Sequence, residues 1–112
     1  MLSKEKRLNL KKDFKWAVSG KLIDTKFAKL YLKVGENTFP RVGIASSSKT
    51  FKKATERNKA RRLISASLES LYSLLPPTMN ILALPKIGVL GVKSGDVLFD
   101  LQEKLKDAKV IS

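Results

Sequence analysis

The sequence predicts an α+β protein, a two-layer α/β sandwich with its elements in the order α-β-β-α-β-α. Three observations support this fold class. Apolar residues recur at helical spacing in three separate stretches. They alternate with polar residues in two others, and near residue 80 they form a short unbroken run typical of a buried strand. The 112 residues suit one domain spanning residues 1–112.

The first helix is expected over residues 9–19. Asn9 can cap its start, and Gly20 can follow its last turn. Trp16 lies opposite the apolar stripe, where it is either a surface ring or a residue that packs late in folding. The apolar stripe consists of Leu10, Phe14, Ala17 and Val18.

Two strands are expected at residues 25–34 and 39–48, joined by turn residues as an antiparallel hairpin. One face of the first strand carries Ala28, Leu30, Leu32 and Val34 and resembles a core face. The other carries Thr25, Phe27, Lys29, Tyr31 and Lys33. In the second strand Gly43, Ala45 and Ser47 share one face, and their small size lets a bulky group approach closely.

A longer helix is expected over residues 56–75, with Thr55 as its N-cap and Pro76-Pro77 ending it. The apolar run from Met79 to Leu84 predicts a buried central strand. A last helix is expected to start near Ser94. The inner faces of the two helices are Ala60, Leu63, Ile64, Ser67, Leu68, Leu71 and Leu75, and then Val97, Leu98, Leu101, Leu105 and Ala108.

Positive charge is concentrated in the first part of the chain. The net charge is +13, and residues 1–62 carry 18 Lys and Arg against 5 Asp and Glu, whereas residues 63–112 carry five of each. This asymmetry predicts one surface that faces a polyanion, most simply a nucleic acid. The alternative is a solvated basic surface without a partner.

The strongest local pattern is the basic run at residues 57–62. On a helix, Asn58, Arg61, Arg62 and Ser65 face outward together, with Arg57 near the edge. Guanidinium groups and an amide at this spacing suit phosphate oxygens and sugar hydroxyls. The alternative is a solvated helix face.

A second pattern places aromatic rings between lysines on the strand at 25–34. Phe27 and Tyr31 can stack nucleic-acid bases while Lys29 and Lys33 meet phosphates. The two rings can equally pack under the first helix, and both readings hold if helix and sheet form the walls of one groove.

Composition excludes several chemistries. The chain has no Cys and no His, which removes disulfides, thiolate metal sites and the usual general base. Its ten carboxylates are scattered; only Asp96 and Asp100 have helical spacing. The start of the chain lacks an apolar signal region, and no apolar run is long enough to span a membrane. A soluble, cytoplasmic protein without hydrolytic chemistry of its own is therefore expected.

Residues 57–63, Arg-Asn-Lys-Ala-Arg-Arg-Leu, resemble the RNR signature helix of the bacterial ribonuclease P protein component. The resemblance extends over nearly the whole chain, through residues 7–8 and 12–14, the strand at 41–46 that enters the basic loop, and the segment 79–86. Within the signature, the third position is Lys59, which keeps the charge but lacks the guanidinium fork.

The resemblance implies a sandwich related to the second domain of ribosomal protein S5. It also implies a non-catalytic subunit that binds the catalytic RNA of ribonuclease P and the single-stranded 5′ leader of precursor tRNA, promoting 5′ maturation of tRNA. The predicted RNA-binding residues are Arg57, Asn58, Lys59, Arg61, Arg62, Lys49, Lys52 and Lys53. The predicted leader cleft contains Phe14, Phe27, Lys29, Tyr31 and Ser47.

The same resemblance implies that the RNA performs the cleavage and holds the Mg²⁺ that the holoenzyme requires. No catalytic residue, bound metal, cofactor, membrane contact or small-molecule substrate is expected for the protein itself. Two alternatives are a ribosomal or other structural RNA-binding protein with an S5-like fold, and a nuclease that acts without RNA.

Overall fold

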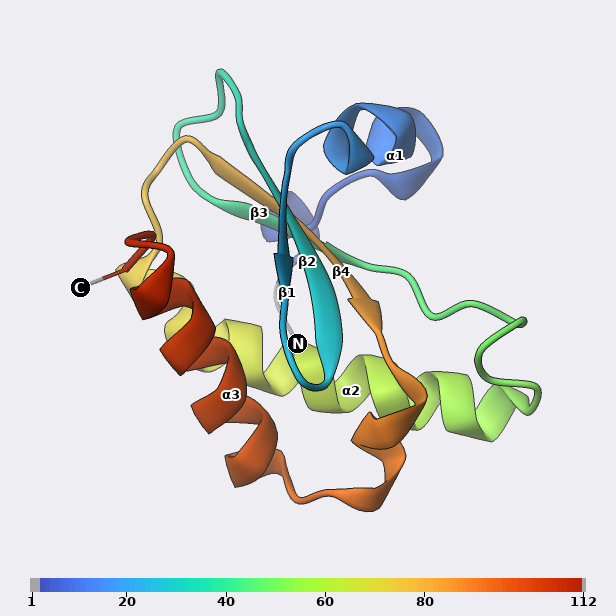
Figure 1. Ribbon diagram of the computed structural model, residues 1–112. Helices are drawn as coiled ribbons and strands as arrows, with labels where there is room; N and C mark the ends of the chain where they lie inside the picture. The colour runs from blue at the N-terminus through green and yellow to red at the C-terminus, as the bar shows by residue number, and fades with distance from the viewer. Residues whose placement is uncertain (1–2, 112) are drawn as a thin grey trace.

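Three α-helices and a four-stranded sheet make up residues 3–111, the part of the chain that the computed structural model describes (Figure 1). The helices are α1 (Leu10–Val18), α2 (Ala54–Leu71) and α3 (Ser94–Asp107). The strands are β1 (Lys21–Asp24), β2 (Ala28–Val34), β3 (Arg41–Ile44) and β4 (Met79–Pro85). Short 3₁₀ turns lie at η1 (Lys4–Lys6), η2 (Tyr72–Leu74) and η3 (Ile87–Gly91).

The order of strands in the sheet is β1-β2-β4-β3, which confirms the α+β class but not the predicted hairpin. Strand β4 lies between β2 and β3, antiparallel to the first and parallel to the second. Its residues are buried except Leu84 and therefore need cover on both faces and neighbours on both sides. The central position provides both, and the two strands expected to pair are separated by it.

Two asparagines satisfy the backbone where the connection from β2 to β3 crosses the start of β4. The Nδ2 of Asn80 donates to the Lys33 carbonyl at 3.2 Å and to the Oδ1 of Asn37 at 2.8 Å. The Nδ2 of Asn37 in turn donates to the carbonyl of Phe39 at 2.7 Å. These bonds replace the strand pairing that a tight hairpin would have made.

Strand β1 was not predicted, and the expected strand at 25–34 begins later, at Ala28. The four residues of β1 are too few to show alternation, and only Ile23 among them is buried. Thr25 ends the extended run because its side chain forms a turn: Oγ1 donates to the Ala28 carbonyl at 2.6 Å and accepts from the Ala28 amide at 3.0 Å.

The sheet carries helices on both faces, unevenly. Helices α2 and α3 cover one face, and the short α1 lies on the other (Figure 1). The side chains of β4 divide accordingly: Ile81 and Ala83 join the main core, whereas Leu82 packs with Leu8 and Ala17 on the α1 side. Because α1 has only nine residues, it leaves part of its face of the sheet open.

The helix boundaries follow their capping groups. Asn9 caps α1 as predicted, accepting from the Lys12 amide at 3.4 Å. Helix α2 begins two residues earlier than predicted, and the prediction of Thr55 as its N-cap is wrong. The N-cap is Lys53, whose amide donates to the side chain of Glu56 at 3.4 Å, and Thr55 lies within the helix. None of the helices within residues 3–111 is long and apolar enough to cross a membrane.

Candidate nucleic-acid interface

The first turns of α2 present an exposed cationic surface. Asn58, Arg61 and Arg62 are exposed, and the Nη2 of Arg61 donates to the Oδ1 of Asn58 at 2.8 Å. This bond ties the guanidinium of Arg61 to Asn58, one turn earlier on the helix, while the side chain stays exposed to solvent. The structure thus brings these three predicted residues together on one side of the helix.

Two other residues of this helix lie apart from that surface. The Nζ of Lys59 donates to the carbonyl of Leu90 in η3 at 3.2 Å, on the flank of α2. Ser65, predicted to face outward, is buried, and that prediction is wrong. Ser65 lines the same pocket as Leu8 and Val42, so α2 faces other parts of the chain over a wider arc than its apolar stripe indicates.

Arg57 joins the helix to the basic loop that precedes it. Its Nη1 donates to the carbonyl of Phe51 at 2.8 Å and to that of Lys52 at 3.4 Å, and the side chain is half-buried. One arm of the guanidinium therefore positions the loop. The remaining N–H groups of the fork are available for an anion.

The loop between β3 and α2 presents three exposed lysines on a buried anchor. Phe51 is 0% exposed, and its amide donates to the Ser47 carbonyl at 2.9 Å. Lys49, Lys52 and Lys53 all point to solvent. Sequence reasoning missed Phe51 as an anchor, although a single large aromatic residue in an otherwise polar loop was a signal for it.

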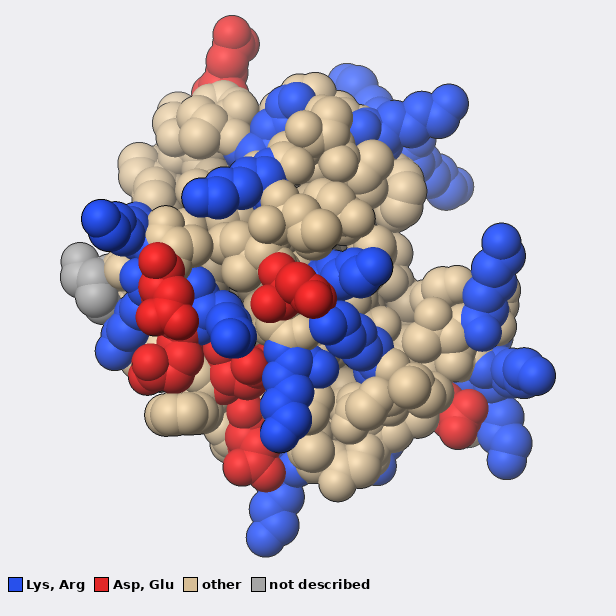
Figure 2. Space-filling view, viewed as in Figure 1, with Lys and Arg blue, Asp and Glu red and all other residues tan. Residues whose placement is uncertain are grey.

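On the other face of the sheet, an aromatic and basic strip lies beside α1. Tyr31 is half-buried against Leu82, and Lys29, on the same face of β2, is exposed. Phe14, on α1, is 38% exposed. Figure 2 shows a notch between the mass around α1 and the lobe formed by the loop and the start of α2, with Lys and Arg on both sides.

Phe27 does not belong to this strip, contrary to the prediction. It is 6% exposed and packs in the main core on the α2 and α3 side. The turn at Thr25 reverses the alternation before β2 begins, and the amide of Phe27 is held by Asp100 of α3 at 3.2 Å. Ser47 is exposed but lies beyond the end of β3, in the loop.

The small face of β3 is filled by the chain itself. A Cβ placed on Gly43 would lie 2.8 Å from Cδ2 of Leu10 and 3.0 Å from Cβ of Leu8. The close approach that small residues permit is therefore made by the N-terminal segment. Ala45, the next residue on this face, stays half-buried at the margin of the α1-side cluster.

Trp16 remains 38% exposed, and its ring also contacts the end of β2. The Nζ of Lys33 lies 5.3 Å from the centre of its ring and donates to the Oγ of Ser19. The edge of the indole also approaches Gly35, whose added Cβ would lie 3.2 Å from it. This side chain thus fastens α1 to the end of β2.

Asp24 and the acidic residues of α3 lie away from the cationic surface, whereas Glu56 lies within it, in the first turn of α2. Asp24 forms an ion pair with Lys86, whose ammonium holds the pKa of that carboxyl below its ordinary value and also donates to the Thr25 carbonyl at 2.6 Å. Figure 2 shows further acidic side chains gathered over α3. Within residues 3–111 no group of three or more acidic side chains could hold a metal ion.

Fold and surface together define a small basic α+β protein of the kind that associates with RNA. The family model for ribonuclease P matches residues 2–109, and the chain therefore belongs to the ribonuclease P protein family. A protein of this family is part of a ribonucleoprotein that processes tRNA.

Solved structures share the fold at low sequence identity. The RNase P protein of Staphylococcus aureus superposes with a TM-score of 0.80 at 23% identity, over 96% of this chain and 98% of that one. A mutant of it with defective mRNA degradation activity gives 0.82 at 23%, over 96% and 92%. The RNase P protein of Thermotoga maritima gives 0.79 at 24%, over 90% and 96%.

Proposed function

We propose that this protein is the RNA-binding, non-catalytic subunit of ribonuclease P and that it grips the catalytic RNA through the start of α2 and the loop before it. The observation that carries the proposal is the exposed group Asn58, Arg61 and Arg62 beside three exposed loop lysines. A guanidinium group can donate two parallel hydrogen bonds to a phosphate, whereas a lysine ammonium attracts phosphates as a point charge in many orientations. The full set is Arg57, Asn58, Lys59, Arg61, Arg62, Lys49, Lys52 and Lys53.

The strip beside α1 is the proposed site for the 5′ leader of precursor tRNA. Phe14 and Tyr31 expose ring surface on which unpaired bases can stack. Lys29 can bind a phosphate of the leader's backbone. Ser47 can bond the leader only from the loop at the margin. Phe27 is not part of this site because it is buried in the main core.

Cleavage in this proposal is performed by the RNA, which also holds the Mg²⁺. The chain has no His, and its carboxylates are scattered or paired, as Asp24 is with Lys86. The residues of the protein bind the catalytic RNA and the precursor tRNA and position one relative to the other. They also lower the repulsion between the two polyanions, so that less Mg²⁺ is needed for that purpose.

Reconstitution with a ribonuclease P RNA tests the proposal. We expect the protein to stimulate cleavage of precursor tRNA at low Mg²⁺ and to cleave nothing without the RNA. Arg61→Ala should weaken binding of the catalytic RNA and reduce the log–log salt slope by about one unit, the effect of one lost phosphate contact. Lys106→Gln, a charge removed from the distant end of α3, is the control.

Three outcomes would count against the proposal. Cleavage by the protein and a divalent metal alone would indicate an independent nuclease. Tight binding to ribosomal RNA without stimulation of tRNA processing would indicate a structural ribosomal protein. Equal affinity and salt slope for Arg61→Ala and the control would remove α2 from the interface.

A further inference from the structure

A pocket of about 700 Å³ lies between the N-terminal segment, β3 and the outer side of α2. Its floor is apolar and consists of Leu8, Leu10, Val42 and Ile44, with Gly43 between the last two. This volume is within the range of about 300–1,000 Å³ typical of small-ligand sites. The pocket is separate from the strip beside Tyr31.

The pocket is formed by main-chain pairing. Residue Arg7 bridges to Val42 in parallel fashion, and the amide of Leu8 donates to the Val42 carbonyl at 2.9 Å. Because Gly43 has no side chain, Leu8 and Leu10 can approach the strand closely. The N-terminal segment is therefore held along the free edge of β3, and main-chain hydrogen bonds fix this wall of the pocket.

Four cations surround this floor: Lys4, Arg7 and Lys11 from the N-terminal side, and Arg61 from α2. Among the described residues 3–111, no Asp or Glu lines the pocket. Cations from two separate segments around an apolar floor match a ligand that has both an anionic group and a flat apolar one. An anion alone would leave the floor unused, and an apolar molecule alone would leave the cations unpaired.

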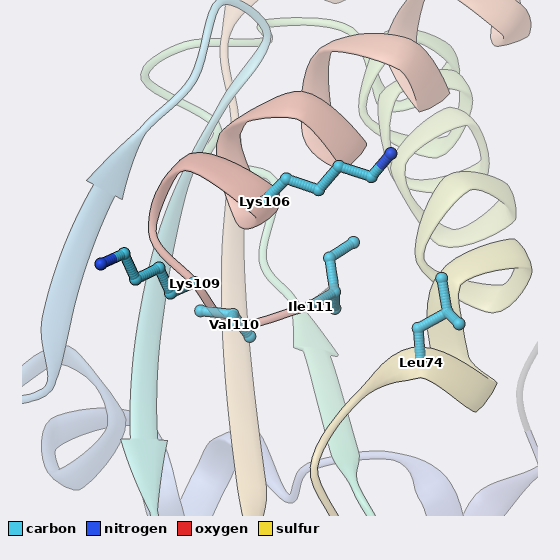
Figure 3. Close-up of a pocket in the computed structure, with 5 residues that line it drawn as sticks. All are labelled: Leu74, Lys106, Lys109, Val110 and Ile111. Atoms are coloured by element: carbon cyan, nitrogen blue, oxygen red, sulfur yellow. The ribbon is translucent and has the colours of Figure 1, made fainter.

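A second pocket, of about 490 Å³, lacks this arrangement of converging cations around an apolar floor. It lies between η2 and the end of α3 and also contains two lysines, Lys106 and Lys109. Figure 3 shows their side chains pointing in opposite directions, so the two ammonium groups do not converge on one ligand. It therefore serves as a control surface.

We propose that the pocket beside β3 binds a single unstacked nucleotide of the RNA partner, with its base on the apolar floor and its phosphate at Arg7 and Arg61. Unstacked nucleotides are the parts of RNA that proteins recognise individually. The inference rests on the proposed function, since Arg61 belongs both to the cationic surface of α2 and to the rim of this pocket.

Titration of the full chain with AMP, monitored by amide resonances, tests the inference. AMP should shift the signals of Leu8, Val42 and Gly43 in a saturable way, whereas adenosine or inorganic phosphate alone should bind more weakly. Arg7→Gln should lower the AMP affinity about tenfold, as expected for loss of one charge-assisted hydrogen bond. Lys106→Gln should leave it unchanged. Thermal unfolding verifies that both variants, altered at exposed side chains, remain folded.

The inference is wrong if AMP gives no saturable shift at these amides, if inorganic phosphate binds as well as AMP, or if the two variants behave alike. Failure of the proposed function has a different signature. In that case Arg61→Ala and Lys106→Gln have the same affinity for ribonuclease P RNA, whatever the result with AMP. If the protein binds the RNA through α2 but has no AMP site, the proposed function stands and only the nucleotide pocket is refuted.

Discussion

Replacing Arg57 by Ala should separate the structural part of the RNR helix from its binding part. The substitution removes the hydrogen bond from Nη1 to the Phe51 carbonyl at 2.8 Å and the longer one to Lys52 at 3.4 Å. Both join the start of α2 to the loop that carries the exposed lysines. Arg61 is the comparison, because its bond to Asn58 lies on the exposed surface.

The magnitude follows from the geometry. A hydrogen bond to a charged donor contributes about 1.5–3 kcal/mol, and the lower part of that range applies because Arg57 is half-buried and water can replace it. We expect the free energy of unfolding to fall by about 1.5–2 kcal/mol for Arg57→Ala and by no more than about 0.5 kcal/mol for Arg61→Ala. At about 4–8 °C per kcal/mol for a domain near this size, the first variant should melt several degrees lower.

Thermal unfolding followed by circular dichroism measures the difference in melting temperature between the two variants. Hydrogen exchange at the Phe51 amide shows whether the loss of stability is at the loop. Arg57→Lys should recover only part of the stability, because an ammonium group cannot reproduce the planar fork. The interpretation is refuted if Arg57→Ala and Arg61→Ala have the same melting temperature, or if the exchange rate of the Phe51 amide is unaffected.

Two further changes test the surroundings of the site. Phe51→Ala should cost about 3–5 kcal/mol, because a fully buried ring is removed, and urea denaturation would show no such loss if the ring were not an anchor. The ion pair with Lys86 lowers the pKa of Asp24 in the folded protein. The ionised carboxylate therefore stabilises the folded state at pH values above the unfolded pKa, and this stabilisation is lost as the pH falls through the lowered pKa, below about 4. Asp24→Asn should therefore flatten the stability profile in that acidic range, and an unchanged profile would exclude the contribution.

Local pattern alone determined much of this protein. Helical spacing identified α1, α2 and α3, and Asn9 was recognised as a cap because capping depends on one residue and the turn after it. The unbroken apolar run of β4 indicated a central strand. The RNR signature identified the family, since its residues lie within two helical turns and need no distant partner to be recognised.

Only the tertiary structure decided which strands pair and which side chains remain exposed. The insertion of β4 between β2 and β3 depends on residues far apart in the chain, and no local period contains it. The turn at Thr25 placed Phe27 in the core, and Leu8 and Leu10 filled the space above Gly43. These outcomes depend on packing between distant segments, where burial and close contact outweigh the alternation of neighbouring residues.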